Sequence, residues 1–499
     1  MIAARHFLLA VVLSALLLGA AASPARAADL HLSDEREIYI ALDKLNAMGL
    51  LPGFMANTRP YDMQAVRAAV QDMPWSGMNV PEETADLGRW VAWYAAPLAS
   101  VRGQVSASYS SDRVVEWNNG GIPTPEGPSA GFSAIGRYEP SPWLSVGGKA
   151  VGWIGESDDR GARFREYSVE IGHKYFSLQA GEITTWYGPG RRGALIFTNN
   201  AEAYPGVRLH NPVPIPFTGF LSFLGYFQYD LFWARMDEDR PVPETTLSGM
   251  RLALRPNRYL EIGASRAMHY GGEGKSDGLG EWWEAFKGEE DGSPNKRNQL
   301  AGYDAMLTLP FKVQPVQLYL EMAGEDQTRG GGTNIVPQPK MWAMTGGVFF
   351  PSILGNPALD LRVEYADNRF EDDGEFWYVH PYSPHEYKGR ILGHSMGTNA
   401  RDFSVQGRWF LRPSTFLEFT VSKTSRVMPV SPDEETTGYR MAFLGWLTPS
   451  LRAGAGIHAQ TSSNTAGVEG NRESGYAAWL DLAWRFSGGY AYLSSKEKP

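Results

Sequence analysis

The stretch from Trp186 to Ala201, WYGPGRRGALIFTNNA, collects side chains that can bind a sugar. An aromatic ring can pack on the apolar face of a sugar ring, and amide or guanidinium groups hydrogen-bond hydroxyls and carboxylates. Gly188, Pro189 and Gly190 interrupt any helix or strand, so the stretch is predicted to be a loop. The candidate binding residues are Trp186, Tyr187, Arg191, Arg192, Asn199 and Asn200.

A second aromatic pair, Trp282 and Trp283, lies in the segment GLGEWWEAFKGEEDG. Two exposed indoles beside Glu281 and Glu284 can stack on a glycan. A small core between loops, or an anchor at a membrane interface, explains the same residues equally well. Both interpretations stay open at the level of sequence.

No catalytic residue, metal or cofactor is predicted, and we do not expect an enzyme. His380, His385 and Glu386 have a loose spacing interrupted by prolines, whereas zinc sites have better-defined ligand patterns. His394 precedes Ser395, but adjacent residues do not form a base–nucleophile pair unaided. A barrel hydrolase is the alternative, and its lipid or glycan turnover would be lost on His394→Ala.

Residues 1–27 have the layout of a secretory signal peptide. Arg5 precedes an apolar run from Phe7 to Ala22, and the sequence Ala25-Arg26-Ala27 offers a small-residue cleavage site. The run is shorter than the about 20 apolar residues that a spanning helix needs. The mature chain is therefore predicted to begin near Ala28, outside the cytoplasm.

The composition favours a large antiparallel β-structure with many turns. An exported chain without cysteine must be stabilised by packing or by a closed sheet rather than by disulfides. The 55 glycines and 33 prolines indicate many turns. Because 55 acidic residues outnumber 46 basic ones, nucleic acid is not an expected partner.

Three short helices are predicted within an N-terminal region, residues 28–98. Asp34 and Glu37 are placed to form a capping box before the first helix. Pro60 and Pro81 stand near the starts of the second and third. The helices form either a small bundle or a lid packed on something larger. Their apolar faces are Ile38, Leu42 and Leu45, then Met63, Val66, Val70 and Met73, then Leu87, Trp90, Tyr94 and Leu98.

From about Val101 the apolar period changes from helical to two, as in LDLRVEY (359–365), VQLYLEM (316–322) and AWLDLAWRF (478–486). Soluble sandwiches also alternate, so the connections decide the class of fold. Roughly eight short turns alternate with about nine long loops, which predicts about 18 antiparallel strands in an outer-membrane barrel. The barrel is expected over residues 99–487, followed by a tail, 488–499.

Two further expectations concern the strand ends. The third long loop is taken as Thr185–Thr218, and the next short turn is placed near Gly225–Phe227. Aromatic residues at strand ends are expected to form girdles at the membrane interfaces. These residues are Tyr259, Trp342, Trp409, Trp446 and Trp484.

On such a barrel, the stretch 186–201 falls in a long outer loop, which offers a second explanation for its residues. A loop folded into the lumen needs Gly and Pro to turn, and its Arg and Asn side chains can satisfy wall groups such as Glu170 and Glu364. The two explanations are compatible. We expect the stretch to close the pore first and to present binding groups second.

At this point the sequence resembles the capsule assembly protein Wzi family. The resemblance rests on Trp186–Pro189, Leu195–Ala201 and Tyr204-Pro205-Gly206, and on a second block, Gly389–Phe403. The structural anchors of these motifs are Gly188, Pro189, Gly190, Pro205, Gly393, His394 and Gly397.

The resemblance implies a non-enzymatic, lectin-like protein of the outer membrane that helps attach or organise capsular polysaccharide or exopolysaccharide. It also implies an occluded 18-stranded barrel with a helical bundle on the periplasmic side. The implied partners are the polysaccharide and outer-membrane lipids, with the polysaccharide export machinery as a further candidate. The alternative function is a substrate-selective porin for saccharides or small solutes, which single-channel conductance would distinguish.

Overall fold

The computed structural model describes residues 29–73, 81–111, 117–122, 124–156, 159–287, 297–325, 342–369, 377–428 and 432–490. The expected signal peptide and its cleavage site lie outside these ranges, as do residues 491–499 of the expected tail. Among the described helices, none is both long and apolar enough to cross a membrane.

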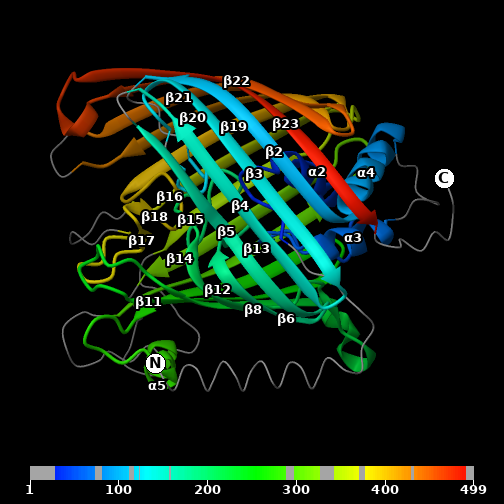
Figure 1. The fold of residues 1–499 in the computed structure, drawn as a ribbon, viewed down its shortest axis with the longest axis horizontal. Coiled ribbons are helices and arrows are strands. Elements are labelled where there is room, and N and C mark those ends of the chain that lie inside the picture. Colours follow the sequence, from blue (N-terminus) through cyan, green and yellow to red (C-terminus); the bar gives the residue numbers. More distant parts are fainter. Residues whose placement is uncertain are drawn as a thin grey trace.

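Eighteen antiparallel strands close into a barrel, as predicted (Figure 1). They are β2 (Pro97–Ser110), β3 (Gly127–Ser141), β4 (Leu144–Ile154), β5 (Arg160–His173), β6 (Phe176–Ile183), β8 (Tyr204–His210), β10 (Tyr226–Arg235), β11 (Thr246–Asn257), β12 (Leu260–Tyr270), β13 (Asn298–Leu309), β14 (Val316–Glu325), β15 (Ala343–Phe350), β16 (Leu359–Asp367), β19 (Ala400–Arg412), β20 (Thr415–Arg426), β21 (Glu434–Thr448), β22 (Leu451–Ser463) and β23 (Arg472–Tyr490). Neighbours along the chain pair throughout, and β23 pairs with β2 to close the wall.

The alternation of side chains confirms that the apolar face of the barrel points outward. In β16, Asp360, Arg362 and Glu364 are buried in the lumen, whereas the apolar residues between them are half-buried or exposed on the outer wall. In β14 the outward Leu320 is 41% exposed, and the adjacent inward Glu321 is 3% exposed. A wall that is apolar outside and polar inside is the arrangement of a membrane barrel.

One strand differs from its predicted position. Residues 219–224 lie between the expected long loop and the expected turn at Gly225–Phe227, which leaves them as a predicted strand. They instead contain a 3-10 helix, η2 (Gly219–Leu224), and the strand is β8, within the expected loop Thr185–Thr218. Pro205 concealed this strand, because proline is usually excluded from strand interiors. It is tolerated here next to the first residue of the strand.

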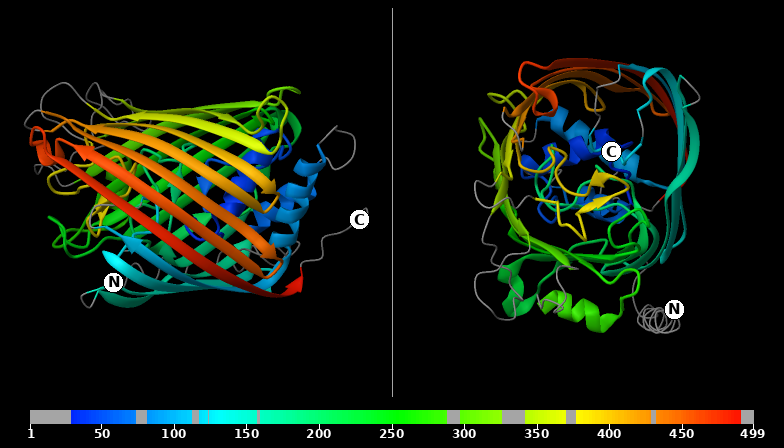
Figure 2. Two further views of the ribbon diagram at one scale, coloured as in Figure 1. Left: turned by 90° about the horizontal axis from the view of Figure 1, so that it is seen from above. Right: turned by 90° about the vertical axis from the view of Figure 1, so that its left-hand side faces the viewer.

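Three helices lie at the short-turn end of the barrel, partly inside it (Figures 1 and 2). They are α2 (Arg36–Ala47), α3 (Met63–Gln71) and α4 (Glu82–Ala95). Their predicted apolar faces are buried, except that Trp90 is only partly buried and Leu98 belongs to β2. They pack on inward-facing wall residues, namely Met306, Tyr319, Phe349 and Trp446.

The predicted capping box before α2 is wrong. Residue Glu35 precedes the helix without a side-chain capping bond. Asp34 instead pairs with Lys149 of β4 at 2.6 Å, and Glu37 pairs with Arg102 of β2 at 2.9 Å. Buried wall cations need partners of opposite charge, and this requirement outweighs a local cap.

The expected aromatic girdle is correct at four of its five positions. Tyr259, Trp342, Trp409 and Trp484 are each between 38% and 50% exposed. Trp446 is the exception: it faces inward, 6% exposed, and lies edge-on against Trp93 and Tyr94 of α4. Trp446 therefore packs against α4 inside the barrel, although the sequence pattern predicted that it faces the membrane interface.

Shorter elements occur in the connections. Inside the barrel, β1 (Thr58–Arg59) pairs with β7 (Trp186–Tyr187). β9 (Ile215–Pro216) extends the wall beside β10, and β17 (Glu386–Tyr387) pairs with β18 (Arg390–Ile391). Helix α5 (Leu279–Lys287) lies outside the wall at the long-loop end, and η3 (Thr465–Gly467) is in the last long loop (Figure 2).

Candidate functional site

One half of the lumen is filled by an apolar piece of the predicted loop. Leu195, Ile196 and Phe197 are fully buried. They pack on a row of inward-facing residues, one from each strand from β10 to β16, which we call the apolar belt. Its members are Ala234, Leu247, Ala267, Leu300, Ala323, Ala343 and Ala366. Small side chains in the wall leave room for large ones in the loop, and this fit seats the loop.

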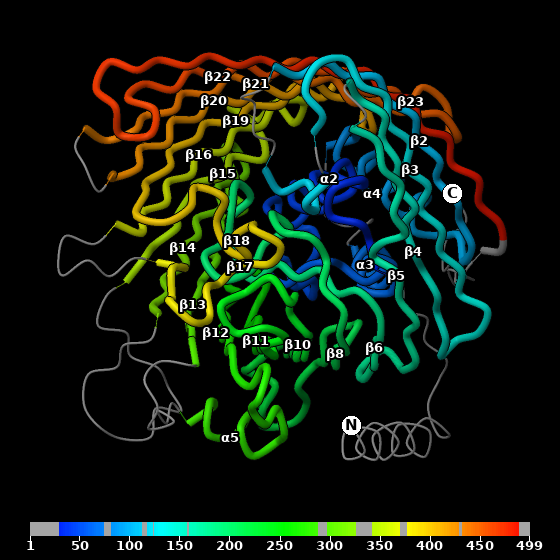
Figure 3. Tube along the Cα trace, turned by 60° about the vertical axis from the view of Figure 1, so that its left-hand side comes forward, coloured from blue at the N-terminus to red at the C-terminus, as the bar shows by residue number. Residues whose placement is uncertain are grey.

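A second loop, residues 377–400, covers this packed half of the lumen (Figure 3). The Tyr378 hydroxyl donates to the Leu195 carbonyl at 2.6 Å, and His385 Nε2 bonds the Ile196 carbonyl at 2.6 Å. A Cβ at Gly393 would lie 2.3 Å from the same Leu195 carbonyl oxygen, so only glycine fits. The two blocks that carry the family resemblance therefore pack on each other.

Trp186 and Tyr187 are both buried, and neither presents a free ring to the outside. The Tyr187 hydroxyl donates to Asp230 in the wall at 2.8 Å, and its ring lies edge-on to Phe197. The guanidinium of Arg59 lies 5.5 Å from the Trp186 ring centre. Tyr187 is thus a packing residue, whereas Trp186 lines a cavity described below.

The turn after Tyr187 is bonded to the N-terminal region and to the wall. Gly188 has φ +132°, where side chains are rarely accommodated, and its amide donates to the Asn57 carbonyl at 2.9 Å. The carboxylate of Glu364 accepts the backbone amides of Arg191 and Arg192, each at 2.7 Å. The wall group Glu364 therefore anchors the turn, but through backbone amides and not through the Arg and Asn side chains that we expected to bond it.

The two arginines of this turn have different partners. Arg191 forms a two-pronged ion pair with Asp43 of α2, with Nη2 to Oδ1 at 2.7 Å. Arg192 pairs with Asp402 at 3.2 Å, and its guanidinium lies 3.7 Å from the ring centre of Trp117. Arg191 thus locks the loop to the helices, whereas Arg192 joins the loop to an aromatic side chain.

The asparagine pair also makes internal bonds. Asn199 Nδ2 donates to Ser33 Oγ at 3.0 Å and to the Asn118 carbonyl at 2.9 Å, and Asn200 Nδ2 donates to the Ile391 carbonyl at 3.0 Å. The other expected wall partner, Glu170, is not used by this loop. It is bonded by Ser177 and His210 of its own wall, at 2.5 and 2.7 Å.

Two further motif residues, His394 and Gly397, make packing contacts and internal hydrogen bonds. His394 is buried and packs on Gly193, where a Cβ would lie 2.2 Å from its ring. Its Nδ1 accepts the Met396 amide at 3.1 Å, and burial lowers its pKa to about 4. Gly397 has φ +86° and accepts a bond from Asn368.

The other half of the lumen contains a cavity of about 300 Å³, which we call the arginine cavity. Seven arginines line it against two carboxylates, Asp43 and Glu364. These arginines are Arg36, Arg59, Arg191, Arg192, Arg362, Arg408 and Arg440. Trp117, Trp186 and the amide side chains of Asn118, Asn119 and Asn199 also line it.

A second cavity, of about 320 Å³, adjoins the first and shares Ser33, Arg36, Asn119 and Arg440 with it. We call it the serine cavity, because small hydroxyl side chains of β2 and β3 line much of its wall. It also contains Trp153 and Trp479, and Arg440 lies 4.8 Å from the Trp479 ring centre. Its serine and threonine residues are Ser33, Ser106, Ser108, Thr124, Ser129 and Ser133.

Ion pairs neutralise some of these arginines, but the arginine cavity keeps an excess of positive charge. Arg36 pairs with Glu418 at 2.8 Å, and Arg362 lies 3.5 Å from Asp43. Burial raises the pKa of Asp43, against the opposing effect of Arg59 and Arg362. Because several arginines converge on few carboxylates, the arginine cavity suits a ligand with negative charge.

Of the predicted site residues, the structure brings Trp186, Arg191, Arg192 and Asn199 together on the arginine cavity. Tyr187 and Asn200 do not line it. Sequence reasoning missed the other half of the site, chiefly Trp117, Arg36 and Arg440. The sequence Trp117-Asn118-Asn119 in a long loop was the available signal, since it places an aromatic ring beside two amides.

Trp282 and Trp283 are far from this lumen site. They belong to α5, on the outer wall, where Trp282 and Phe286 stack with ring centres 5.4 Å apart. Trp282 Nε1 donates to Ser248 of β11 at 3.1 Å. Trp283 is 48% exposed.

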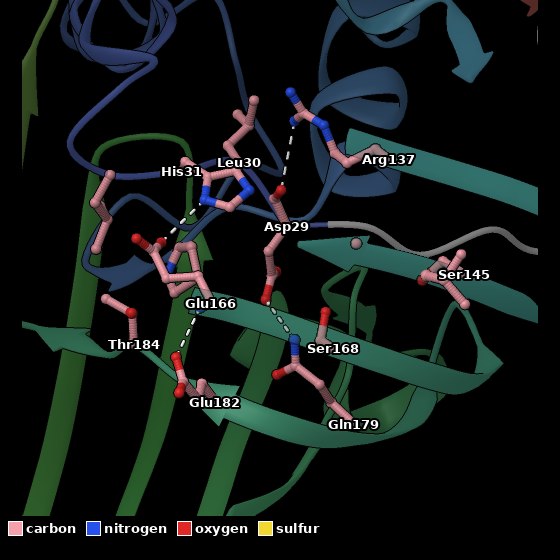
Figure 4. Close-up of a pocket in the computed structure, with 14 residues that line it drawn as sticks. Asp29, Leu30, His31, Arg137, Ser145, Glu166, Ser168, Gln179, Glu182 and Thr184 are labelled. Carbon is pink, nitrogen blue, oxygen red and sulfur yellow. Dashed lines mark hydrogen bonds and ion pairs between the residues drawn. The ribbon is translucent and has the colours of Figure 1, made fainter. Parts of the chain in front are cut away.

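A small cavity of about 40 Å³ lies where residues 29–32 meet the wall (Figure 4). His31 Nδ1 lies 2.9 Å from Glu166, and Gln179 donates to Asp29 at 3.0 Å. His31, Asp34 and Glu166 hold ligand atoms within 4.8 Å of one another. Lys149 Nζ, however, lies 2.6 Å from Asp34 and 3.4 Å from Glu166, so an ammonium already supplies the positive charge there.

Comparison with known proteins agrees with this architecture. An uncharacterized 55.8 kDa protein in the cps region of Klebsiella pneumoniae is 29% identical over 284 residues, covering 54% of this chain. The match spans 55% of that relative's length. The structure of Wzi from Escherichia coli has a TM-score of 0.71 at 18% identity, covering 92% of this chain and 99% of that one. That protein is described as a carbohydrate-binding β-barrel of the outer membrane involved in group 1 capsule assembly.

A more distant barrel, OprD of Pseudomonas aeruginosa, has a TM-score of 0.45 at 10% identity, covering 78% of this chain and 95% of that one. The model of the capsule assembly protein Wzi family matches residues 82–474, which include most of the wall, both family blocks and most of the cavity lining. The outward apolar wall and this match place the protein in the outer membrane. The chain belongs to the capsule assembly protein Wzi family.

Proposed function

We propose that the arginine cavity and the serine cavity hold a segment of acidic capsular polysaccharide or exopolysaccharide. In this proposal the protein supports capsule assembly or attachment as a binding protein, without a catalytic step. The observation that carries it is the lining of the arginine cavity, where seven arginines meet two carboxylates beside Trp117 and three asparagines.

The arginine cavity has the charge that a sugar acid requires, whereas the serine cavity also contains Asp34, Glu37, Glu418 and Asp481 and offers mainly hydroxyl contacts. A guanidinium fork can bind a carboxylate at two points, and an indole face covers the apolar side of a sugar ring. Serine and asparagine side chains supply donors and acceptors for hydroxyls. Each cavity, at about 300 Å³, is at the lower end of the size range of small-molecule sites, roughly 300–1,000 Å³.

The description of the Escherichia coli Wzi as a carbohydrate-binding protein supports the same function for this chain. The stretch 186–201 then has the double role that we expected. Leu195 to Phe197 close the packed half of the lumen, and Arg192 and Asn199 face the cavity. The polysaccharide export machinery is a candidate partner for the periplasmic helices.

Binding of the purified protein to extracted acidic polysaccharide of the host tests the proposal. Arg440 lines both cavities, so Arg440→Ala should lower the affinity at least tenfold, as about 1.4 kcal/mol is lost with a charge-assisted contact. The matched control is Arg401→Ala, because Arg401 lies on the outer wall and is exposed. Equal affinities for the two variants, or no binding by the wild type, would exclude the proposal.

The alternative, a porin, makes a different prediction about conductance. In the described residues, α2, α3 and two loops occupy the lumen, and these parts are held by buried ion pairs. The proposed binding protein should show almost no single-channel conductance in planar bilayers. Stable stepwise conductance of the wild type would favour a porin for saccharides or small solutes.

A further inference from the structure

Helix α5 is unusual because it lies on the outer face of the barrel, which elsewhere is the membrane-facing wall (Figure 2). Residues 266, 268 and 270 of β12 point outward, since the alternating residues Glu261, Ser265 and His269 face the lumen. Met268 and Tyr270 are nevertheless buried, in a small cluster with Ala285 of α5.

The helix covers an arginine that would otherwise face lipid. Arg266 is outward-facing yet only 5% exposed. Its Nη2 donates to the Ala285 carbonyl at 3.3 Å, and its guanidinium lies 5.2 Å from the Phe286 ring centre. An arginine on the lipid face of a barrel is destabilising, most strongly at the midplane and less near the interface. The helix removes this cost by supplying a polar and aromatic cover.

The length of β12 sets the depth of α5. This strand has 11 residues and follows Tyr259, an exposed aromatic at the short-turn end. Eleven tilted residues rise about 26 Å, which is close to the roughly 25 Å height of the apolar band. Positions 266 to 270 are therefore in the outer half of the membrane, and α5 lies beside them.

The exposed edge of α5 is apolar and continues the lipid-facing wall. Leu279 and Trp283 are one helical turn apart, 59% and 48% exposed. Below them, Leu252 of β11 and Ile262 of β12 are exposed apolar residues of the outer wall. Trp283 also stacks near Phe286, with ring centres 5.5 Å apart, so aromatic rings lie where an interfacial girdle is expected.

We infer that α5 is a membrane-embedded element whose Leu279–Trp283 edge inserts into the outer-leaflet lipids of the outer membrane. The occupant of this edge is lipid, because the edge is continuous with the lipid-facing wall and its depth is that of the outer leaflet. Arg297 ties the opposite side of the helix to the wall region through Glu281 and Glu284, at 2.6 and 3.0 Å. The helix is therefore held in place from its polar side.

The absence of cysteine from the whole chain permits a direct test. A spin label is attached to Trp283→Cys in the full-length protein, reconstituted in phosphatidylcholine vesicles, and its collisions with oxygen and with a water-soluble nickel complex are compared. Leu252→Cys serves as the lipid reference and Glu273→Cys, in an exposed loop, as the aqueous reference. All three positions are exposed, so the labels should leave the fold intact.

The inference predicts that the label at 283 behaves like the label at 252. Both should collide often with oxygen and rarely with the nickel complex. Accessibility like that at 273 would overturn it. Spin–spin broadening at 283 would also overturn it, because that result would assign the edge to a second copy of the chain. Failure of polysaccharide binding elsewhere in the protein would not affect any of these outcomes.

Discussion

The two halves of the lumen are built on different inner walls. From β10 to β16, each strand contributes one small or apolar residue to the apolar belt, and the loop residues Leu195 to Phe197 pack against it. Along β2, β3 and β19 to β22, the corresponding wall carries serine, threonine, glycine and arginine, and two cavities remain. One half is closed by packing, and the other is left open for polar contacts.

The difference shows that the conspicuous loop motif and the binding chemistry are largely separate. Gly188, Tyr187, Gly393 and His394 serve the packed half, where close approach of backbones leaves no space for a ligand. Arg192 and Asn199 are at the boundary and reach the arginine cavity. Substitutions in the two halves should therefore affect different measurements.

The largest effect is expected from Phe197→Ala in the packed half. Phe197 is fully buried against Tyr187 and Phe232, both at 5.3 Å between ring centres, so its removal should cost about 3–5 kcal/mol of loop stability. Faster amide hydrogen exchange in residues 186–201 and new channel activity would report the loosened loop. Outward Phe403→Ala is the control, and equal exchange in both variants would break the comparison.

Acidification should open the same half with an effect of similar size. Burial lowers the pKa of both His385 and His394 to about 4, whereas an exposed histidine titrates near 6.5. The closed loop is therefore fully stable above pH 6.5 and loses stability as the pH falls from 6.5 towards 4. The loss is up to about 3 kcal/mol for each histidine. Conductance and hydrogen exchange, measured at pH 7.5 and pH 4.5, would show the change, and His385→Gln should reduce it.

Filling the other half should abolish binding with little effect on stability. Ser106 points into the serine cavity, so Ser106→Phe should exclude the polysaccharide while the melting temperature changes by a few degrees at most. The adjacent Ala107 points outward, and Ala107→Phe is the matched control. Retained affinity in Ser106→Phe would show that the cavity is not the binding site.

The smallest effect is expected from Arg192→Lys at the boundary. The lysine keeps the charge near Asp402 but loses the planar contact with Trp117 and the fork that binds a carboxylate. Affinity should fall several-fold, which corresponds to about 1 kcal/mol. Isothermal titration would detect this fall in affinity. An unchanged affinity would show that Arg192 anchors the loop and does not bind the polysaccharide.

The sequence by itself determined the barrel, because the alternation of apolar and polar residues is a local property of each strand. It also determined the three amphipathic helices and the strand number. It failed where a residue's neighbours are distant in the chain. Asp34 and Glu37 satisfy a capping pattern, yet they form ion pairs with Lys149 and Arg102 of the wall.

Only the tertiary structure decided which polar residues bond to other residues of the protein and which line a cavity. Arg191 and Arg192 are identical and adjacent, but one meets Asp43 on a helix and the other meets Trp117 in a different loop. Arg36 and Arg440, far apart in the sequence, both line the two cavities. Such residues become neighbours only when the barrel closes, so no local sequence pattern predicts their proximity.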